Sequence, residues 1–437
     1  MKYFLNKFIK AELKPNFYFF YLGLFLLPSA FPIAAILLLI SIIYTNVLSR
    51  KEFLKDQWNL PFLFGSFFML ISSFVHTFHN EQLINYNLDS SLTWVGLANW
   101  IPFFICFWGF QPYLNSSNLR KIACLILLSG SLPVLITGIG QSLFGWYGPF
   151  EAFNGLIIWY QRPYEGIHAG LTGLFNNQNY AGVWLNIIWP FCIASGISAR
   201  KNIVEKTLIL SFMFSITLCT ILTNSRSAWL GIIIGTLLML REKSYKFFIS
   251  LILIVGLIIT STIIPIFGES MQNFLKILIP KSIWMEFSDF QFSRLEIWKS
   301  AINSILTNPI FGTGGGSFSK IFRYETGLWK GHAHNLPLEF TVSYGIIAGL
   351  FVFLPIIFLV YLSLRKIVLN MKFKKFSITL YDKAWIASLL IILISQMVDV
   401  QYFDGRISIV FWLLLSGSKN FVSEVNIVKK FRRYIET

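Results

Sequence analysis

Residues 335–362 of this 437-residue chain read NLPLEFTVSYGIIAGLFVFLPIIFLVYL and contain a single charged side chain, that of Glu339. About 20 consecutive apolar residues are enough for a helix to cross a bilayer. The stretch is longer than that and shows no polar face, so a helix on the core of a soluble protein is the weaker interpretation. It therefore predicts a transmembrane helix.

The same pattern recurs along the whole chain, where apolar runs alternate with short charged clusters. The sequence is 55% hydrophobic and 13% charged, whereas a soluble domain carries about 25% charged residues. We expect an all-α membrane protein that forms a single polytopic domain over residues 1–437. The runs predict 12 spans: two short ones within 17–46, then 60–78, 94–112, 121–143, 171–198, 207–223, 227–240, 247–266, 335–362, 384–399 and 405–418.

The basic residues indicate which side of the membrane each connection faces. The net charge is +16, and most Lys and Arg lie in short connections at one side of the predicted spans. This is the positive-inside pattern of a membrane protein, and it argues against nucleic-acid binding. Twelve spans with both termini in the cytoplasm place every basic cluster inside, and they leave acidic residues such as Asp399 and Asp404 in outer connections.

Two of the predicted outer connections are long, at residues 144–170 and 267–334. Connections of this length are usually functional or disordered. The loop at 267–334 contains helical patterns and many aromatic residues, which favours function. We expect it to be a large outer loop with short amphipathic helices.

One such helix has clear start and stop signals. Ser293 and Glu296 form a capping box, and Asn308-Pro309 ends the pattern. The residues between them predict an apolar stripe of Leu295, Trp298, Ile302 and Ile305 on the membrane surface. Arg294 falls at the first helical position, where an anionic ligand would gain from both the guanidinium and the free backbone N–H groups. An ion pair of Arg294 with Glu296 or Glu286 is the alternative.

Arg226 lies in the polar run TNSRSAW at residues 223–229, between two short predicted spans. Residues 207–240 give about 51 Å of helix, whereas two crossings need roughly 60 Å. The turn that holds Arg226 is therefore expected in a depression below the outer membrane surface. A guanidinium at that depth usually marks a functional site, and an Arg that extends to the surface is the alternative.

His334 stands where the loop at 267–334 meets the membrane. A neutral imidazole there can serve as a general base or acid, and Asn335 can cap the next helix or orient the imidazole. His332 and His334 form a pair at i and i+2, but without a third ligand at a helical spacing they are a weak metal signal. We therefore predict His334 as the catalytic residue and no metal.

Residues 175–180 read FNNQNY and open a predicted span. Four amides at a membrane boundary are costly unless they bind polar groups. A helix cap explains one or two of them, and a sugar ligand would explain the others, so Asn176 and Asn179 are predicted to bind substrate. Arg162 in the preceding loop suits contact with a sugar or a phosphate. The glycine run at 312–316 is more typical of a tight turn than of an anion site.

Taken in order, these stretches resemble the O-antigen ligase and O-antigen polymerase superfamily of bacterial inner-membrane proteins. The resemblance covers about residues 170–350 and is fairly specific there, whereas the first 140 residues share only hydropathy with the family. It rests on GLFNNQNYAG at 173–182, SRSAWLG at 225–231, RLEIWKSA at 294–301, and GTG at 312–314 followed by HNLPLE at 334–339 and Gly345.

The resemblance implies a multispanning, GT-C-like glycosyltransferase that needs no metal and no cofactor. Its donor would be a glycan on undecaprenyl diphosphate, and its acceptor would be lipid A-core, a protein or a growing glycan. Arg226 and Arg294 would hold the diphosphate, and His334 would assist the attack of an acceptor hydroxyl. The reaction would take place at the periplasmic face of the inner membrane.

Ligase and polymerase share these motifs, so the sequence does not separate them. The alternative from another class is a membrane transporter of a small anion such as bicarbonate. A transporter needs ionisable residues near the middle of the bilayer, whereas the predicted spans are nearly free of charge there. A third interpretation is a scaffold for a polysaccharide-assembly complex.

Overall fold

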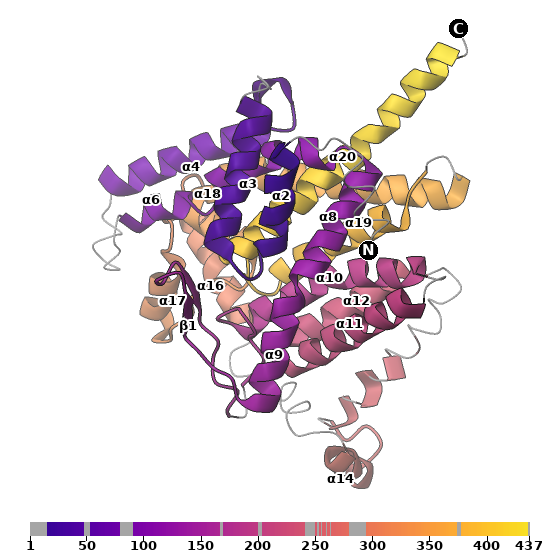
Figure 1. The fold of residues 1–437 in the computed structure, drawn as a ribbon. Helices are drawn as coiled ribbons and strands as arrows, with labels where there is room; N and C mark the ends of the chain where they lie inside the picture. The colour runs from indigo at the N-terminus through magenta and orange to yellow at the C-terminus, as the bar shows by residue number, and fades with distance from the viewer. Residues whose placement is uncertain are drawn as a thin grey trace. The chain divides into compact units, whose positions relative to one another are not determined.

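The computed structural model of the chain describes residues 15–47, 53–78, 91–166, 169–199, 203–240, 250, 253–254, 256–258, 260–262, 264–278, 294–373 and 377–435. These residues form mainly α-helices (Figure 1). The elements are α2 (Pro15–Leu26), α3 (Phe31–Ile42), the π-helix η1 (Ile43–Val47), the 3-10 helix η2 (Phe53–Lys55), α4 (Leu60–Phe78), α6 (Ser91–Leu97), α7 (Ile101–Gly109), the 3-10 helix η3 (Gln111–Leu114), α8 (Ser117–Gly130), α9 (Leu132–Phe144), β1 (Phe150–Ala152), β2 (Ile157–Trp159), α10 (Gln178–Ser198), α11 (Ile203–Leu222), α12 (Arg226–Met239), α14 (Glu269–Leu278), α16 (Arg294–Thr307), α17 (Phe318–Thr326), α18 (Leu336–Phe373), α19 (Leu380–Gln396) and α20 (Gly405–Ile435).

Within the described residues, six helical segments are long and apolar enough to cross a membrane, and three shorter helices are also apolar. The long segments are Leu60–Phe78, Ser91–Gly109, Ser117–Phe144, Gln178–Ser198, Ile203–Leu222 and Leu336–Met371; the short ones are Pro15–Leu26, Phe31–Asn46 and Arg226–Met239. The all-helical multispanning plan is thus confirmed in outline. The count of 12 spans and the outer position of the loop at 267–334 stay predictions.

The chain divides into two compact units. Unit 1 comprises Met1–Leu132 and Glu296–Thr437, and unit 2 comprises Pro133–Leu295. The sequence predicts one polytopic domain over residues 1–437, and this stays a prediction.

Unit 1 has a core of packed aromatic rings. The indole of Trp412 on α20 lies edge-on to the ring of Phe62 at 5.2 Å and to that of Phe104 at 5.1 Å between centroids. Such edge-to-face pairs stabilise a core beyond the area they bury. They hold α4, α7 and α20 together, and α18 packs along α4 in the same unit.

Helix α18 is interrupted at Gly345, whose φ of 84° and ψ of 169° are not helical. The break releases the carbonyl groups of Val342 and Ser343 from the helix. The backbone N–H groups of Thr313 and Gly314 donate to these two carbonyls at 2.7 and 3.1 Å. Backbone groups of the glycine run are therefore used to complete the broken helix, which fits the predicted turn better than an anion site.

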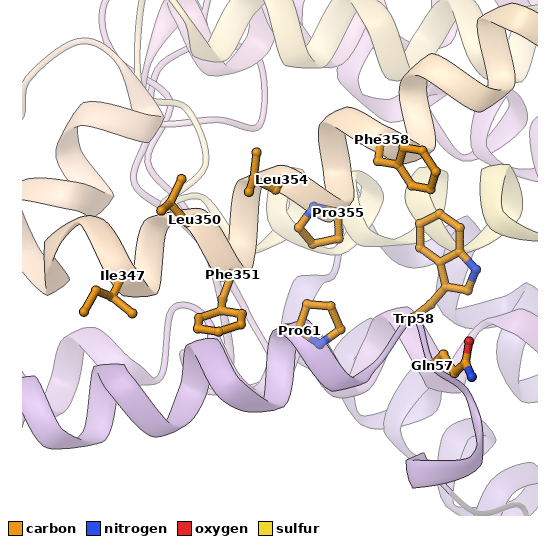
Figure 2. A pocket seen from close by; sticks show the side chains of 9 residues that line it. All are labelled: Gln57, Trp58, Pro61, Ile347, Leu350, Phe351, Leu354, Pro355 and Phe358. Atoms are coloured by element: carbon orange, nitrogen blue, oxygen red, sulfur yellow. The ribbon is translucent and has the colours of Figure 1, made fainter.

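A shallow apolar groove runs between α4 and α18 within unit 1. Figure 2 shows Pro61 on the α4 side opposite Phe351 and Pro355 of α18, and Trp58 opposite Phe358. Its lining is almost entirely apolar, as is expected of a surface that faces lipid.

Unit 2 contains α10, α11 and α12, which lie side by side (Figure 1). An ideal Cβ at Gly182 of α10 would lie 2.5 Å from the Cβ of Ala228 on α12, and the indole N–H of Trp189 donates to Thr236 Oγ1 at 2.9 Å. Contacts in this order mean that α10 and α12 run parallel, with their N-termini adjacent. The segment 144–170 adds a small antiparallel hairpin of β1 and β2 that the all-α prediction did not include.

The amphipathic helix α16 begins at Arg294 and ends at Thr307, as its sequence signals predict. Ser293, its predicted cap, lies outside the described residues. Of the predicted apolar stripe, Leu295 and Ile302 are exposed and Ile305 is buried. The face that packs inside the protein consists of Ile297, Ser300, Ala301, Ser304 and Ile305. The position of the stripe on the membrane surface stays a prediction.

Candidate active site

His334 lies in the connection that precedes α18, with its backbone in the left-handed region at a φ of 51°. Both neighbours of His334 are tied to the first turns of α18. The Ala333 N–H donates to Glu339 Oε2 at 2.8 Å, and Asn335 Oδ1 accepts from the Leu338 N–H at 3.0 Å. Asn335 is thus the N-cap of α18, one of the two roles that the sequence suggested.

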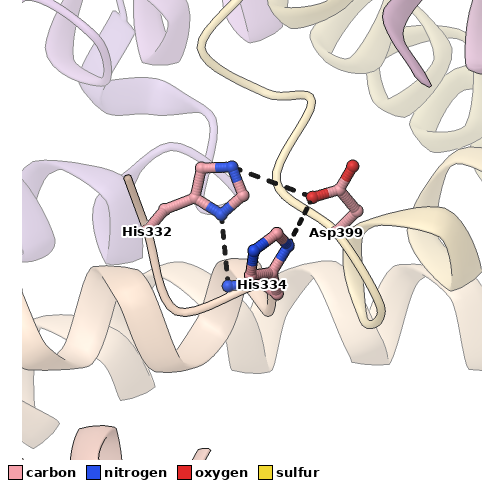
Figure 3. Close-up of side chains that lie close together, drawn as sticks. All are labelled: His332, His334 and Asp399. Carbon is pink, nitrogen blue, oxygen red and sulfur yellow. Dashed lines mark hydrogen bonds and ion pairs between the residues drawn. The ribbon is translucent and has the colours of Figure 1, made fainter. Parts of the chain in front are cut away.

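The imidazole of His334 contacts a carboxylate 65 residues further along the chain. His334 Nδ1 lies 2.8 Å from Asp399 Oδ1 (Figure 3). Asp399 belongs to the connection between α19 and α20, and Asn335 Nδ2 donates to the Met397 carbonyl at 3.0 Å in that connection. Asn335 therefore fixes the two segments that carry the imidazole and the carboxylate.

His332 is the third member of the cluster. Its Nε2 lies 3.8 Å from Asp399 Oδ1, and its Nδ1 accepts the backbone N–H of His334 at 3.2 Å (Figure 3). The two imidazole rings meet edge to face, with 4.3 Å between their centroids. His332 therefore supports the backbone of His334 at the same time as it faces the shared carboxylate.

The electrostatics of the cluster favour an ionised Asp399. Burial opposes the charge, but the hydrogen bond with His334, the two imidazoles and the backbone N–H of Val400 together lower the pKa of Asp399 below its ordinary value. Burial also lowers the pKa of His332 to about 4, against the attraction of Asp399. At neutral pH the cluster thus holds a carboxylate and a neutral His332.

This arrangement suits general base catalysis. When His334 is neutral and carries its proton on Nδ1, that N–H donates to Asp399 and Nε2 keeps its lone pair. The carboxylate fixes the tautomer and would stabilise the imidazolium that forms after proton uptake. The His334 side chain is 26% exposed and that of Asp399 is 6% exposed, so substrate can reach the base but not its partner.

The same three side chains also qualify as ligands for a metal ion. One nitrogen of each imidazole and one oxygen of Asp399 lie within 4.8 Å of one another. His332 and His334 have no third ligand at a helical spacing in the sequence, and the fold supplies Asp399 from a distant connection. That no metal binds stays a prediction.

Helix α16 packs against the segment 332–335, which carries His332 and His334. Ala333 lies in one hydrophobic cluster with Ile297 and Ala301 of α16 and with Phe318 of α17. Arg294 is exposed at the start of α16, one turn before Ile297. The sequence predicted Arg294 as a diphosphate ligand, and this role stays a prediction.

Arg226 is the first residue of α12, in unit 2. Its side chain is exposed, and the turn before it is held by hydrogen bonds from the Leu171 N–H to the Leu222 carbonyl at 2.8 Å and from Asn224 Nδ2 to the Ala169 carbonyl at 2.6 Å. Because α10 and α12 begin side by side, the positive ends of two helix dipoles lie next to the Arg226 backbone. This combination favours a phosphate.

The three other predicted ligands also belong to unit 2. Arg162 and Asn176 are exposed, and Asn179 is half-buried in the first turn of α10. The side chain of Asn177 caps α10 by accepting the Asn179 N–H at 2.7 Å. Capping thus uses one of the four amides, as expected, and the roles of Asn176, Asn179 and Arg162 in substrate binding stay predictions.

The structure brings His334, Asn335 and His332 together with Asp399, which the sequence analysis counted only as an outer charge. Arg226 belongs to the other compact unit, so its convergence with His334 stays a prediction. Asp399 gave a weak signal in the sequence, as an acidic residue beside Gln396 and Gln401 directly after an apolar helix.

Residues 210–354, which include Arg226, Arg294 and His334, match the family model described as O-Antigen ligase. Over these residues the chain is similar to the O-antigen ligase superfamily. Asp399 lies outside the matched region, and so do Arg162, Asn176 and Asn179. The resemblance seen in the sequence is confirmed.

A protein with a specified activity is also similar to this chain. It is the ComP-specific O-oligosaccharyltransferase of Acinetobacter baylyi (strain ATCC 33305 / BD413 / ADP1), which is 23% identical over 257 residues. The match covers 56% of this chain and 43% of the relative. The chain thus matches less than half the length of that protein. Neither match is to a transporter, so the anion-transporter alternative gains no support.

Proposed function

We propose that the protein transfers or polymerises a glycan from an undecaprenyl-diphosphate-linked donor to an acceptor hydroxyl at the periplasmic face, as an O-antigen ligase or polymerase does. The observation that carries the proposal is the 2.8 Å contact between His334 and the buried Asp399. It joins a histidine of the family-matched region to a carboxylate that can orient it.

The reaction is a displacement at the anomeric carbon of the donor. The acceptor oxygen attacks that carbon while its proton passes to His334 Nε2, and the bond from the anomeric carbon to the diphosphate oxygen breaks. The electron pair of this bond leaves with the undecaprenyl diphosphate. Asp399 stabilises the resulting imidazolium, which later returns its proton to water or to the leaving group.

The diphosphate needs positive charge as it leaves. Arg226 and Arg294 supply guanidinium groups, and the paired N-termini of α10 and α12 add backbone N–H donors beside Arg226. We propose that these groups neutralise the leaving diphosphate without a metal ion, while Asn176, Asn179, Asn335 and Arg162 contact the sugars.

The partners follow from this reaction. They are the lipid-linked glycan as donor, and lipid A-core, a protein or a growing glycan as acceptor. The 12-span plan places the protein in the bacterial inner membrane with both termini in the cytoplasm. The site would then face the periplasm, beyond the outer ends of the spans.

The proposal is tested with purified protein in lipid nanodiscs and a labelled undecaprenyl-diphosphate-linked glycan. Replacement of Arg226 or Arg294 by Ala is expected to lower kcat/KM by roughly 10²-fold or more, because each change removes a charge-assisted contact to the diphosphate. Arg323→Ala, at an exposed position of α17, is the matched control. Unchanged transfer by both site variants would refute the diphosphate assignment.

The rival function has a separate assay. Vesicles that contain the wild-type protein are expected to take up no more bicarbonate than empty vesicles. Protein-dependent uptake, together with no transfer of labelled glycan, would favour the transporter.

A further inference from the structure

A small pocket opens beside the histidine cluster, entirely within unit 1. It has a volume of about 210 Å³ and is bounded by α6, the glycine run, the segment before α18 and the first turns of α18. Two chain segments contribute to both the pocket and the histidine cluster. Gly331 lines the pocket and precedes His332 by one residue, and Phe403 lines the pocket and follows Asp399 by four residues. Its occupant would therefore lie close to His334.

One of the side chains that line the pocket is acidic and buried. Glu339 is only 5% exposed, and its Oε2 accepts the Ala333 N–H. Among the described residues this is the one hydrogen-bond partner that the structure shows for the Glu339 carboxyl group. A carboxyl group with a single partner has further acceptor positions, which hydroxyl donors of a ligand can use.

A hydroxyl and an amide lie in the same pocket. The hydroxyl group of Tyr344 lies against Gly96 and Gly315. An ideal Cβ added to Gly96 would lie 2.5 Å from the Tyr344 hydroxyl oxygen, and one added to Gly315 would lie 3.4 Å from it. Both glycines line the pocket, and so does Asn99. The glycine backbone thus makes space in which the phenol and the amide can act as donors or acceptors.

The remaining walls are apolar and include Val95, Phe340 and Phe403. No Lys, Arg or His is among the described residues that line the pocket, so an anion or a phosphate would lack a counter-charge there, and this number of polar groups does not suit a lipid tail. The volume is below the roughly 300–1,000 Å³ of sites for drug-sized ligands. A single uncharged ring with several hydroxyl donors and an apolar face fits all of these properties.

We propose that this pocket is a subsite for one hexopyranose ring, held by hydroxyl donation to Glu339 and by contacts with Tyr344 and Asn99. The inference rests on the proposed glycan transfer and deepens it. The ring belongs either to the acceptor or to the first sugar of the donor, since both present the same chemistry. Glu339 is then a specificity-determining residue that requires hydroxyl groups on the sugar.

Binding is measured on the full chain in nanodiscs by saturation-transfer NMR, with methyl α-glucopyranoside, methyl α-galactopyranoside and methyl α-mannopyranoside as probes and the open-chain polyol mannitol as the negative control. At least one pyranoside is expected to bind. Glu339→Gln keeps an acceptor for the Ala333 N–H but replaces the second carboxyl oxygen by an amide NH₂, which cannot accept from a sugar hydroxyl, so binding should weaken roughly tenfold or more.

Two further variants keep the test decisive. Glu325→Gln changes an exposed carboxylate outside the pocket that accepts from Ser300, and it should alter binding by less than about twofold. Val95→Trp fills the entrance from a position that is 61% exposed, so it should abolish binding even if Glu339→Gln folds poorly. Equal binding by wild type, Glu339→Gln and Val95→Trp, or equal signals for mannitol and the pyranosides, would overturn the subsite.

Two more measurements identify the source of the ring and separate the two proposals. Undecaprenyl-diphosphate-linked GlcNAc should displace the pyranoside if the ring belongs to the donor and leave it bound if the ring belongs to the acceptor. His334→Ala is expected to abolish transfer and to retain pyranoside binding. Loss of the subsite with normal transfer would refute only this inference, whereas binding without any transfer by the wild type would refute only the proposed function.

Discussion

Helix α19 carries an aspartate at each end, and the two aspartates hold opposite kinds of partner. Asp382, in the first turn, binds the guanidinium of Arg120, which is fully buried; Arg120 Nη2 lies 2.8 Å from Asp382 Oδ1 and 3.0 Å from Glu424 Oε2. Asp399, just past the last turn, binds His334, which stays 26% exposed. Of these two buried carboxylates, Asp399 is the one whose side-chain partner is open to a substrate.

Further hydrogen bonds distinguish the Arg120 cluster from the His334 cluster. Asp382 also accepts from Ser117 and forms a capping box with Thr379, and Arg120 donates to the Leu114 carbonyl as well. The Arg120 cluster therefore surrounds a fully buried guanidinium with acceptors and links α8, α19 and α20. The His334 cluster leaves one imidazole nitrogen for chemistry.

The largest effect is expected at His334. His334→Gln should lower kcat for glycan transfer by about 10⁴-fold, because the proton of the acceptor loses its base. The thermal unfolding temperature should change little, since this side chain is part of no closed network. Transfer by purified variants is the measurement, and activity within tenfold of wild type would contradict the catalytic role.

Arg120→Met should produce the opposite result, with lost stability and retained chemistry. It leaves the charge of Asp382 buried without its main partner, which typically costs about 3–5 kcal/mol. Unfolding in rising SDS measures this, and transfer per folded molecule should stay near that of wild type. The double variant Arg120→Met with Asp382→Asn should recover part of the loss, and a double variant no more stable than the single one would contradict the pairing.

Asp399→Asn should act between these two extremes. The amide preserves the shape of the side chain but removes the charge that stabilises the imidazolium, so kcat should fall by about 10²-fold with little change in KM. Asp404→Asn is the matched control, because Asp404 lies in the same connection as Asp399 and pairs with Arg406 at the start of α20. An equal loss of activity in both variants would show that Asp399 acts only through the fold of the connection.

A smaller effect on stability is expected from His332. Its pKa is lowered to about 4 in the folded protein, whereas the unfolded chain takes up the proton near pH 6.5. The unfolded state therefore binds more protons between pH 6.5 and 4, and the folded state loses stability as the pH falls through that range. His332→Asn should remove about 2 kcal/mol of the loss between pH 7 and pH 5. Unfolding curves at both pH values measure this, and identical losses in the two proteins would contradict it.

The smallest effect is expected from metal removal. Dialysis against EDTA should leave transfer unchanged, because arginines neutralise the leaving diphosphate in the proposed reaction. A loss of activity that Zn²⁺ or Mn²⁺ restores would instead assign a metal to His332, His334 and Asp399. Loss of the response in His332→Asn would confirm that assignment.

The sequence predicts the bounds of single helices better than it predicts the site. Apolar run length places α4 at its observed bounds, and a cap signal places the start of α16, because both depend on neighbouring residues alone. The contact between His334 and Asp399 spans 65 positions and depends on how α18 and α19 pack, which no local spacing encodes. The burial of Glu339 was also unforeseen, because the first turn of a span usually lies near water.

The interruption at Gly345 has a mechanical consequence. An ideal Cβ at this position would lie 2.0 Å from the Ile310 carbonyl oxygen, and the Ile346 N–H donates to the Pro309 carbonyl rather than to its own helix. The turns that bear Glu339 and the first residue after the break are thus both bonded to residues 309–314. The change of direction in α18 is therefore fixed by backbone contacts, and a side chain larger than hydrogen at position 345 should disturb them.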